Sequence, residues 1–297
     1  MQAPAWPLSK LRALSWAYLL LVAVSVVTFA QRGDITFGKQ PLANLAATLK
    51  ELSRPSFLDV FTGPERLEYK ADDGRVLRVE NRRVVERNYL AALAEAVWIT
   101  LAIGTLGSFF AGVIALPLGF VAARNVNAPA WLAWPVRGVL DACRAVHTLV
   151  FGLVFVGIVG LGPMAGILAI ICHSLGSYGK LYAEAIEGAD GNLFESGLAL
   201  GLKPWQVLVH AMRRGFYPQF VSAHLYLWEF NVRDSTVLGL IGAGGIGLLV
   251  SEAVSLFQWG RLATLLIVIV LLVVILDRAS ASARSALLAR TRAVAHD

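Results

Sequence analysis

The chain has 297 residues, of which 57% are hydrophobic and only 15% are charged, and its formal net charge is +6. Soluble domains carry about 25% charged residues, so this composition excludes a disordered chain and a disulfide-bonded secreted domain, and argues against a soluble enzyme. It predicts an all-α polytopic membrane protein, whose positive charge belongs to cytoplasmic loops and not to nucleic-acid binding.

Apolar runs long enough to cross the hydrocarbon layer, roughly 20 residues of helix each, recur along the chain. We expect about six transmembrane helices: Ala13–Ala30, Tyr89–Ala123, Val139–Gly160, Met164–Ile186, Phe216–Leu240 and Leu262–Leu276, the last extended back toward Phe257. The first is an anchor and not a cleaved signal peptide, because no small-residue cleavage site follows it. The even number of spans, with Lys and Arg at their ends, predicts that both termini are cytoplasmic.

Residues 31–88 would then form a periplasmic segment. Within it, Leu67 and Tyr69 alternate with polar residues, and Asp73-Gly74 is typical of a tight hairpin turn. We expect a small extracytoplasmic β-hairpin here, with strands at Glu65–Lys70 and Arg75–Asn81. The alternative is a loop without regular structure.

Two segments match nucleotide-binding loops only in part. Gly33–Gln40 has the spacing of a phosphate-binding loop, but Gln40 stands where Ser or Thr would hold Mg²⁺. Gly242, Gly244 and Gly247 fit the dinucleotide pattern, yet they follow a membrane span and not a β-strand. We therefore expect no cofactor on this chain, with ATP and Mg²⁺ on a separate subunit if ATP drives it. No His or Cys spacing predicts a metal site.

The fifth predicted span carries polar residues where lipid would require apolar ones. These are Glu229, Asn231, Arg233, Asp234, Ser235 and Thr236. Ionisable residues inside a span usually face a cavity or a partner, and Glu229 and Arg233, four residues apart, share a helix face. We expect this set, together with Arg144 near the inner end of the third span, to line a translocation pathway in which Arg233 meets an anion. The alternative is that the charges only tie helices together.

Glycines interrupt the apolar sequence directly after these residues. Gly242, Gly244 and Gly245 permit a tight turn and a close approach of helices. A helix that breaks here would offer backbone groups to an anion, so we place these three glycines in the same pathway.

The segment between the fourth and fifth predicted spans is expected to form an elbow of two short helices at residues 192–214. Asn192 suits an N-cap with Glu195 in the capping-box position, Gly201 suits a helix C-terminus, and Pro204 suits the next first turn. An apolar face of the second helix, formed by Trp205, Leu208 and Met212, would need the membrane surface or another protein to cover it.

This elbow resembles the EAA loop of ABC-importer membrane subunits. Glu195 matches the acidic residue of that pattern, Gly201 the glycine six positions later, and Ala211 its isoleucine position. The positions that depart from the pattern are Ser196, Gly197, Arg213 and Arg214. Three further segments resemble the phosphonate-type permease family: Asp141–Ala145, Gly160–Pro163 and Asn231–Gly247.

The resemblance, which covers roughly Tyr89–Arg278, implies a type I ABC importer permease in the bacterial inner membrane that carries phosphonate, phosphite or hypophosphite. It implies a second copy of this chain, two ATP-binding subunits and a periplasmic substrate-binding protein as partners. The residues that would couple to the ATPase are Glu195, Gly201, Leu202, Lys203, Pro204, Trp205, Leu208 and Met212.

The chain would accordingly comprise a tail and first helix at 1–30, the periplasmic segment at 31–88, a permease core at 89–278 with the elbow at 192–214, and a cytoplasmic tail at 279–297. The rival interpretations are an ABC permease for another small solute such as an amino acid, a stand-alone secondary transporter, and a membrane-embedded enzyme. No inverted repeat and no convergent catalytic set supports the last two.

Overall fold

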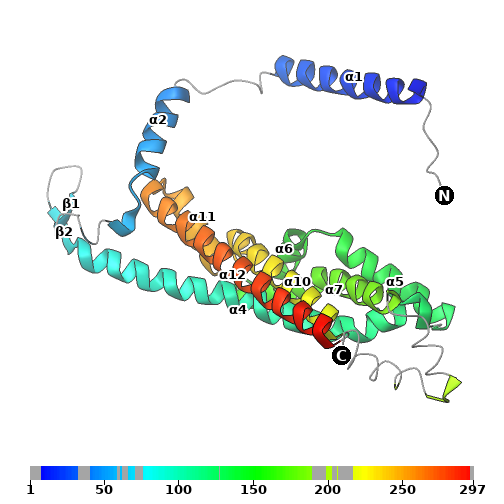
Figure 1. The fold of residues 1–297 in the computed structure, drawn as a ribbon. Coiled ribbons are helices and arrows are strands. Elements are labelled where there is room, and N and C mark those ends of the chain that lie inside the picture. The colour runs from blue at the N-terminus through cyan, green and yellow to red at the C-terminus, as the bar shows by residue number, and fades with distance from the viewer. Residues whose placement is uncertain are drawn as a thin grey trace. The chain divides into compact units, whose positions relative to one another are not determined.

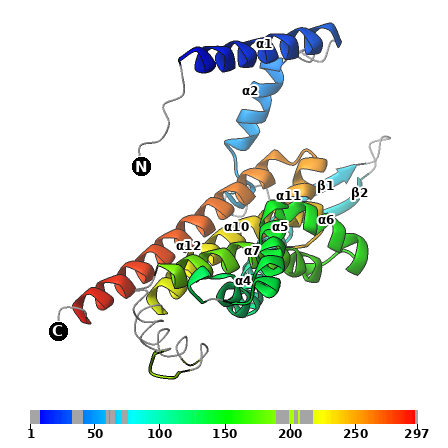
Figure 2. The ribbon, with the colours of Figure 1, turned by 90° about the vertical axis from the view of Figure 1, so that its right-hand side faces the viewer.

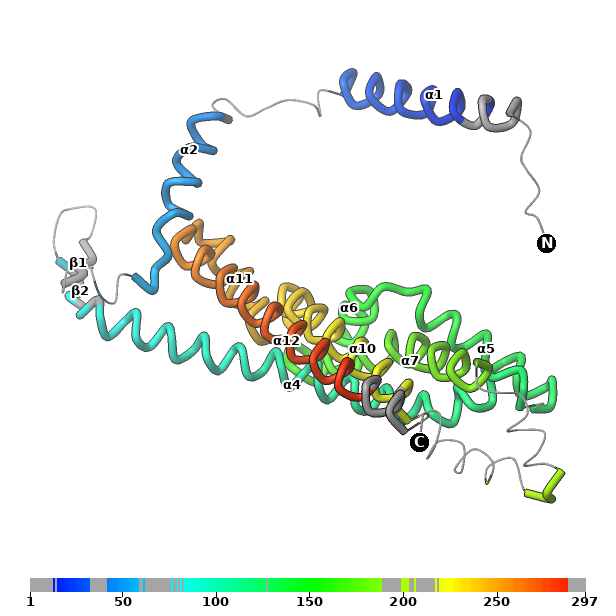
Figure 3. Tube along the Cα trace, viewed as in Figure 1, coloured from blue at the N-terminus to red at the C-terminus, as the bar shows by residue number. Residues whose placement is uncertain are grey.

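The computed structural model describes residues 8–32, 41–58, 61, 66–70, 76–126, 128–188, 199–202, 206 and 217–294, which Figure 3 traces in chain order. The chain consists of two compact units, Met1–Lys50 and Glu51–Asp297. The first unit holds α1 (Leu8–Arg32) and most of α2 (Pro41–Leu52).

Helix α1 contains the first predicted span and fits a lipid environment. Its large apolar side chains are exposed, so within the unit they lack a protein core to cover them. The hydroxyls of Ser25 and Thr28 donate to the carbonyls of Leu21 and Val24 at 2.8 and 2.7 Å. Polar side chains that bond their own helix in this way leave no unpaired group facing hydrocarbon.

The second unit begins with a short 3₁₀ helix, η1 (Ser56–Leu58), and two antiparallel strands, β1 (Arg66–Lys70) and β2 (Val76–Asn81). Arg66 lies opposite Asn81, and the register shifts between Tyr69 and Lys70. The strands lie at the positions expected for the hairpin, whose turn falls outside the described residues. The Asn81 side chain accepts the Arg83 N–H at 3.0 Å and so caps the helix that follows.

Long helices make up the rest of this unit. They are α4 (Arg82–Ala122), α5 (Ala130–Ala145), α6 (Thr148–Val159), α7 (Pro163–Glu187), α10 (Tyr217–Leu238), α11 (Ile246–Ser255) and α12 (Trp259–Val294), with 3₁₀ turns η2 (Arg124–Val126) and η4 (Gly239–Ile241). Helix α10 packs against both α4 and α12, which Figures 1 and 2 show from two sides. Among the described residues, four helices can cross a membrane, or up to six spans form if each of two bent helix pairs counts as one.

The prediction of one continuous third span over Val139–Gly160 is wrong. Two helices, α5 and α6, meet there at an angle of 92°. Val146 is extended, and His147 caps α6 by accepting the Leu149 N–H on Nδ1 at 3.2 Å. The apolar composition continues across this break, so hydropathy does not reveal it. Helix α12 likewise continues past Leu276, through most of the predicted tail.

Small residues allow α4, α5 and α7 to pack closely. A Cβ on Gly119 of α4 would lie 2.9 Å from the Gly179 carbonyl of α7, and a Cβ on Gly176 would meet the Leu140 carbonyl of α5. Inside a membrane, the hydrophobic effect does not drive one helix against another. Close packing of helix backbones supplies attraction between the helices instead. Around it, Tyr182 packs against Phe220 of α10, with ring centroids 4.6 Å apart.

Candidate functional site

The glycine run breaks the fifth span, as the sequence predicts. Helix α10 ends at Leu238, and the chain bends by 42° before α11 begins. Gly242, Gly244 and Gly245 have φ values of +98°, +86° and +71°, which residues with a Cβ rarely adopt. The Gly242 carbonyl accepts the N–H of Gly162, which precedes α7, at 2.9 Å.

Thr100 of α4 holds this break in place. Its hydroxyl donates to the Ala96 carbonyl and accepts the N–H of Ile246, the first residue of α11, both at 2.9 Å. Ser235 of α10 donates to the Thr100 carbonyl at 2.9 Å. The first backbone donor of α11 is therefore bonded within the protein, and Gly245 and Ser235 are buried.

Asn231 links three helices from a fully buried position. It accepts a hydrogen bond from Ser174 of α7 at 2.7 Å and donates one to Ser108 of α4 at 2.8 Å. Only 1% of the residue is exposed. Interhelical bonds of this kind contribute about 0.6–2 kcal/mol each in membrane proteins. In this geometry Asn231 holds helices together. This is the alternative to a pathway role that the sequence left open for the polar residues of this span.

Arg233, in contrast, lies on an uncovered face. Half of its side chain is exposed, and its Nη2 lies 3.1 Å from Oε1 of Glu229. The other Glu229 oxygen lies 3.8 Å from Nη2 of Arg284, whose guanidinium sits 5.9 Å from the ring centre of Tyr226. Two cations thus share one carboxylate. Arg284 is not among the predicted pathway residues, because it falls in the predicted tail.

The uncovered face of α10 follows helical periodicity. It consists of Tyr226, Phe230, Arg233 and Val237, and it continues into η4 at Leu240. Residues at this spacing form one stripe along a helix. The stripe is apolar except for Arg233, so it places one positive charge in a surface that lipid or another protein subunit would cover.

Asp234 faces the broken third span. Its Oδ2 accepts the hydroxyl proton of Thr148, the first residue of α6, at 2.7 Å. Nδ1 of His173 lies 2.8 Å from the Val146 carbonyl at the same break. Thr236, the last predicted pathway residue, donates to the Arg233 carbonyl at 2.7 Å. Asp234 therefore ties α10 to the α5–α6 corner.

Arg144 lies in a different part of the molecule. It pairs with Asp141 at 2.8 Å and lines a pocket formed by α4, η2, α5 and α7. No α10 residue lines that pocket among the described residues. The structure therefore does not bring Arg144 together with Arg233.

Two of the eight expected coupling residues, Gly201 and Leu202, lie in the described part of the chain. Gly201 is exposed with φ +77°, and Leu202 packs against the core cluster of α4, α7 and α10. The other expected coupling residues lie outside the described residues: Glu195, Lys203, Pro204, Trp205, Leu208 and Met212. Their role stays a prediction.

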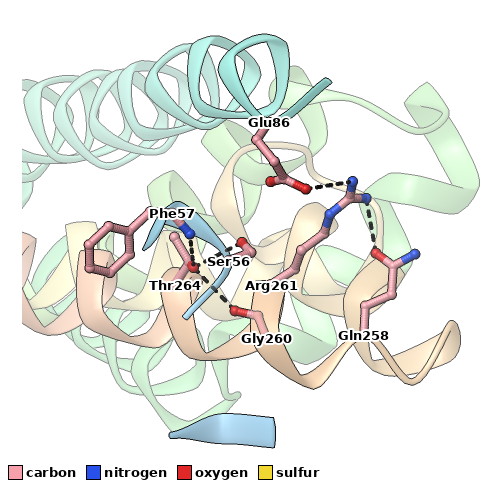
Figure 4. A network of polar contacts seen from close by, with 7 residues as sticks. All are labelled: Ser56, Phe57, Glu86, Gln258, Gly260, Arg261 and Thr264. Atoms are coloured by element: carbon pink, nitrogen blue, oxygen red, sulfur yellow. Dashed lines mark hydrogen bonds and ion pairs between the residues drawn. The ribbon is translucent and has the colours of Figure 1, made fainter. Parts of the chain in front are cut away.

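A polar network that was not predicted from the sequence joins η1, α4 and α12 (Figure 4). The hydroxyls of Ser56 and Thr264 lie 3.1 Å apart. Arg261 donates to Gln258 at 3.0 Å and lies 3.8 Å from buried Glu86. The segment before the hairpin is thereby attached to the last helix. Its residues come from three distant stretches, and no local pattern signals their meeting.

A family model described as "Binding-protein-dependent transport system inner membrane component" matches residues 115–284. The chain is similar to the phosphite transport system permease protein PtxC of Stutzerimonas stutzeri, at 43% identity over 179 residues that cover 60% of this chain and 65% of the relative. It is similar to the phosphate-import permease protein PhnE of Mycolicibacterium smegmatis at 37% identity, covering 63% of this chain and 35% of the relative. The chain thus spans under two thirds of either relative.

Among solved structures, the fold is similar to a chain of the inward-facing MetNI methionine ABC transporter. The TM-score is 0.60 at 24% identity, with 66% of this chain and 96% of that chain covered. This likeness shows the fold, which is that of type I ABC importer permeases. These matches confirm the fold class and the family resemblance expected from the sequence.

Proposed function

The chain belongs to the family of binding-protein-dependent transport system inner membrane components, and we propose that it is the permease subunit of an ABC importer for a phosphorus oxyanion. Phosphonate, phosphite and hypophosphite are the candidate solutes. The main support is the 43% identity to a phosphite transport permease. Arg233 supports it chemically, because it is a half-exposed cation in the uncovered stripe of α10.

The shared carboxylate suggests how Arg233 would handle an anion. Glu229 can remain paired with Arg284 while the Arg233 side chain rotates to bind an oxyanion in the pathway. No charge is then left unpaired in a low-dielectric region. The guanidinium suits the geometry of phosphorus oxyanions. Because Glu229 competes for the same cation, the solute would bind weakly enough to leave again.

The proposed assembly contains a second copy of this chain, two ATP-binding subunits that carry ATP and Mg²⁺, and a periplasmic binding protein. The apolar stripe of α10 supports a second copy, since a translocation pathway between two copies would cover it. Both termini would be cytoplasmic. ATP binding would favour an outward-open state through the elbow, and hydrolysis would reset the complex.

The elbow assignment has its own test at Gly201. Its φ of +77° is incompatible with proline, whose ring fixes φ near −65°. Gly201→Pro should abolish ATP-driven uptake while the chain still inserts in the membrane. Normal uptake with this variant would contradict the docking of this segment on an ATPase.

A permease for another small solute, such as an amino acid, is the main competing interpretation. The test is growth of a strain that lacks only this chain on phosphate, methylphosphonate, phosphite or hypophosphite as sole phosphorus source. Loss of growth on one reduced-phosphorus source would identify the solute. Normal growth on all four, in a strain without a redundant importer, would refute the proposed solute class.

A further inference from the structure

A pocket of about 270 Å³ lies where α4 ends, beside η2, the C-terminal half of α5 and the last two turns of α7. Four cationic side chains line it: Arg124, Arg137, Arg144 and Lys180. Three carboxylates line it as well: Asp141, Glu184 and Glu187. It is separate from the α10 stripe described above.

The carboxylates do not neutralise all four cations. Arg144 pairs with Asp141 at 2.8 Å, and Lys180 lies 3.5 Å from Glu184. Glu187 accepts the backbone N–H of Arg124 at 2.8 Å. Among the described residues, no carboxylate lies within ion-pair distance of the Arg124 guanidinium.

Arg137 is in a similar position. Its Nε donates to the Ala122 carbonyl at the end of α4, at 2.7 Å, which leaves its two terminal nitrogens for another acceptor. Within the described chain, no carboxylate pairs with this guanidinium either. A guanidinium presents its donors in a planar fork that matches the oxygens of a phosphate.

The pocket is held by rigid helix packing. Leu140 and Ala183 are buried at its base, and Gly179 lets the Leu140 side chain lie directly against α7. The Asn125 side chain donates to the Ile186 carbonyl at 2.7 Å, which attaches η2 to α7. The Arg137 guanidinium is held by its bond to the Ala122 carbonyl, so this cation is positioned before a ligand arrives, which lowers the entropic cost of binding.

The first turn of α5 lies beside this pocket along the helix and carries two exposed tryptophans. Trp131 and Trp134 are 76% and 81% exposed. Tryptophans gather where a membrane meets water, at the level of the lipid headgroups. We expect the pocket to lie near this level, where phosphate groups of lipids and free anions are both available.

We propose that this pocket binds a phosphorus oxyanion through Arg124 and Arg137, as a regulatory or structural site apart from the transport pathway. The group is either the phosphate of an anionic lipid or a free oxyanion such as inorganic phosphate. The volume of about 270 Å³ holds one tetrahedral oxyanion with several waters, each of which takes about 30 Å³ in the liquid.

The test uses the full-length chain in nanodiscs, so its outcome does not depend on transport. In discs of phosphatidylcholine alone, inorganic phosphate is titrated and the melting temperature is followed. In a second arm, phosphatidylglycerol is added to the discs, and lipid retained by the protein is counted by native mass spectrometry. Variants are Arg124→Gln and the charge-conserving Arg137→Lys, with Arg278→Gln on α12 as a matched control outside the pocket.

A free-oxyanion site predicts saturable stabilisation by phosphate that weakens at least tenfold in Arg124→Gln. The effect weakens less in Arg137→Lys, which keeps the charge but loses the planar fork, and it does not change in Arg278→Gln. A lipid site predicts no phosphate effect, but retention of phosphatidylglycerol that Arg124→Gln abolishes. If neither probe binds, or if Arg124→Gln and Arg278→Gln behave alike in both arms, the proposal is wrong. Because binding is measured without uptake, its failure leaves the proposed transport function untouched.

Discussion

Gly245→Ala tests the glycine break at its most constrained point. The backbone there has φ +71° and ψ −158°, a region that is essentially reserved for glycine. A Cβ would also meet the Thr100 hydroxyl oxygen, which already accepts the Ile246 N–H. The added methyl group therefore has two costs. It strains the backbone at residue 245, and it clashes with the Thr100 side chain, which cannot move without losing a buried hydrogen bond.

The cost can be estimated from these two effects. Forcing a residue with a Cβ into such a conformation costs about 1–3 kcal/mol. Overpacking against Thr100, or displacing it, adds about 1–3 kcal/mol. The sum of about 2–6 kcal/mol is a large share of the total stability of a folded protein, which is about 5–15 kcal/mol.

Thermal unfolding of the chain in nanodiscs measures the effect. Gly138→Ala is the matched control, because Gly138 lies in a helix with open space where its Cβ would be. It should be neutral or stabilising by up to about 1 kcal/mol. The double variant Gly245→Ala/Thr100→Ala should cost less than the sum of its single variants, since removing the hydroxyl removes the obstruction. Equal melting temperatures for Gly245→Ala and Gly138→Ala would refute the reasoning.

Three further predictions concern polar residues. Asn231→Leu leaves two buried serine hydroxyls without their partner and should lower the free energy of unfolding by about 1–3 kcal/mol; an unchanged denaturation midpoint would contradict its linking role. Arg233→Gln should reduce solute uptake by about tenfold or more with ATPase activity retained, whereas Arg278→Gln should leave uptake unchanged. Equal uptake by the two variants would contradict a role of Arg233 in the pathway. Arg261→Met removes the cation that lies 3.8 Å from buried Glu86 and should destabilise the chain by about 1–3 kcal/mol, with Arg261→Lys intermediate. A melting curve like the parent's would argue against the outer network.

Much of the fold follows from local sequence. Hydropathy locates both ends of α7 and the C-terminal end of α4 within one residue, because polar residues or a glycine turn bound these apolar runs. Helix α4 begins at Arg82, seven residues before the predicted Tyr89, because its first two turns are polar. The break after α10 was predictable because glycine is the residue that a positive φ demands. In both cases the decisive information lies within one stretch of chain.

The rest depends on contacts between distant stretches. The corner at Val146–His147 contains no proline or glycine, and its geometry is secured by Asp234 and His173 from other helices. Arg284 reaches Glu229 only because α12 continues beyond its apolar portion. Such pairings are set by tertiary packing, which periodicity and local motifs do not encode.

The hydrogen bond from the Gly162 N–H to the Gly242 carbonyl joins two glycine turns through main-chain atoms alone. Every residue type except proline supplies that donor, and every residue supplies that acceptor. A substitution at either turn can therefore strain the connection without deleting it. During sequence divergence, the attachment of the α10–α11 bend to the start of α7 can persist while the side chains around it change. A comparison of side-chain identities alone would not detect this shared attachment.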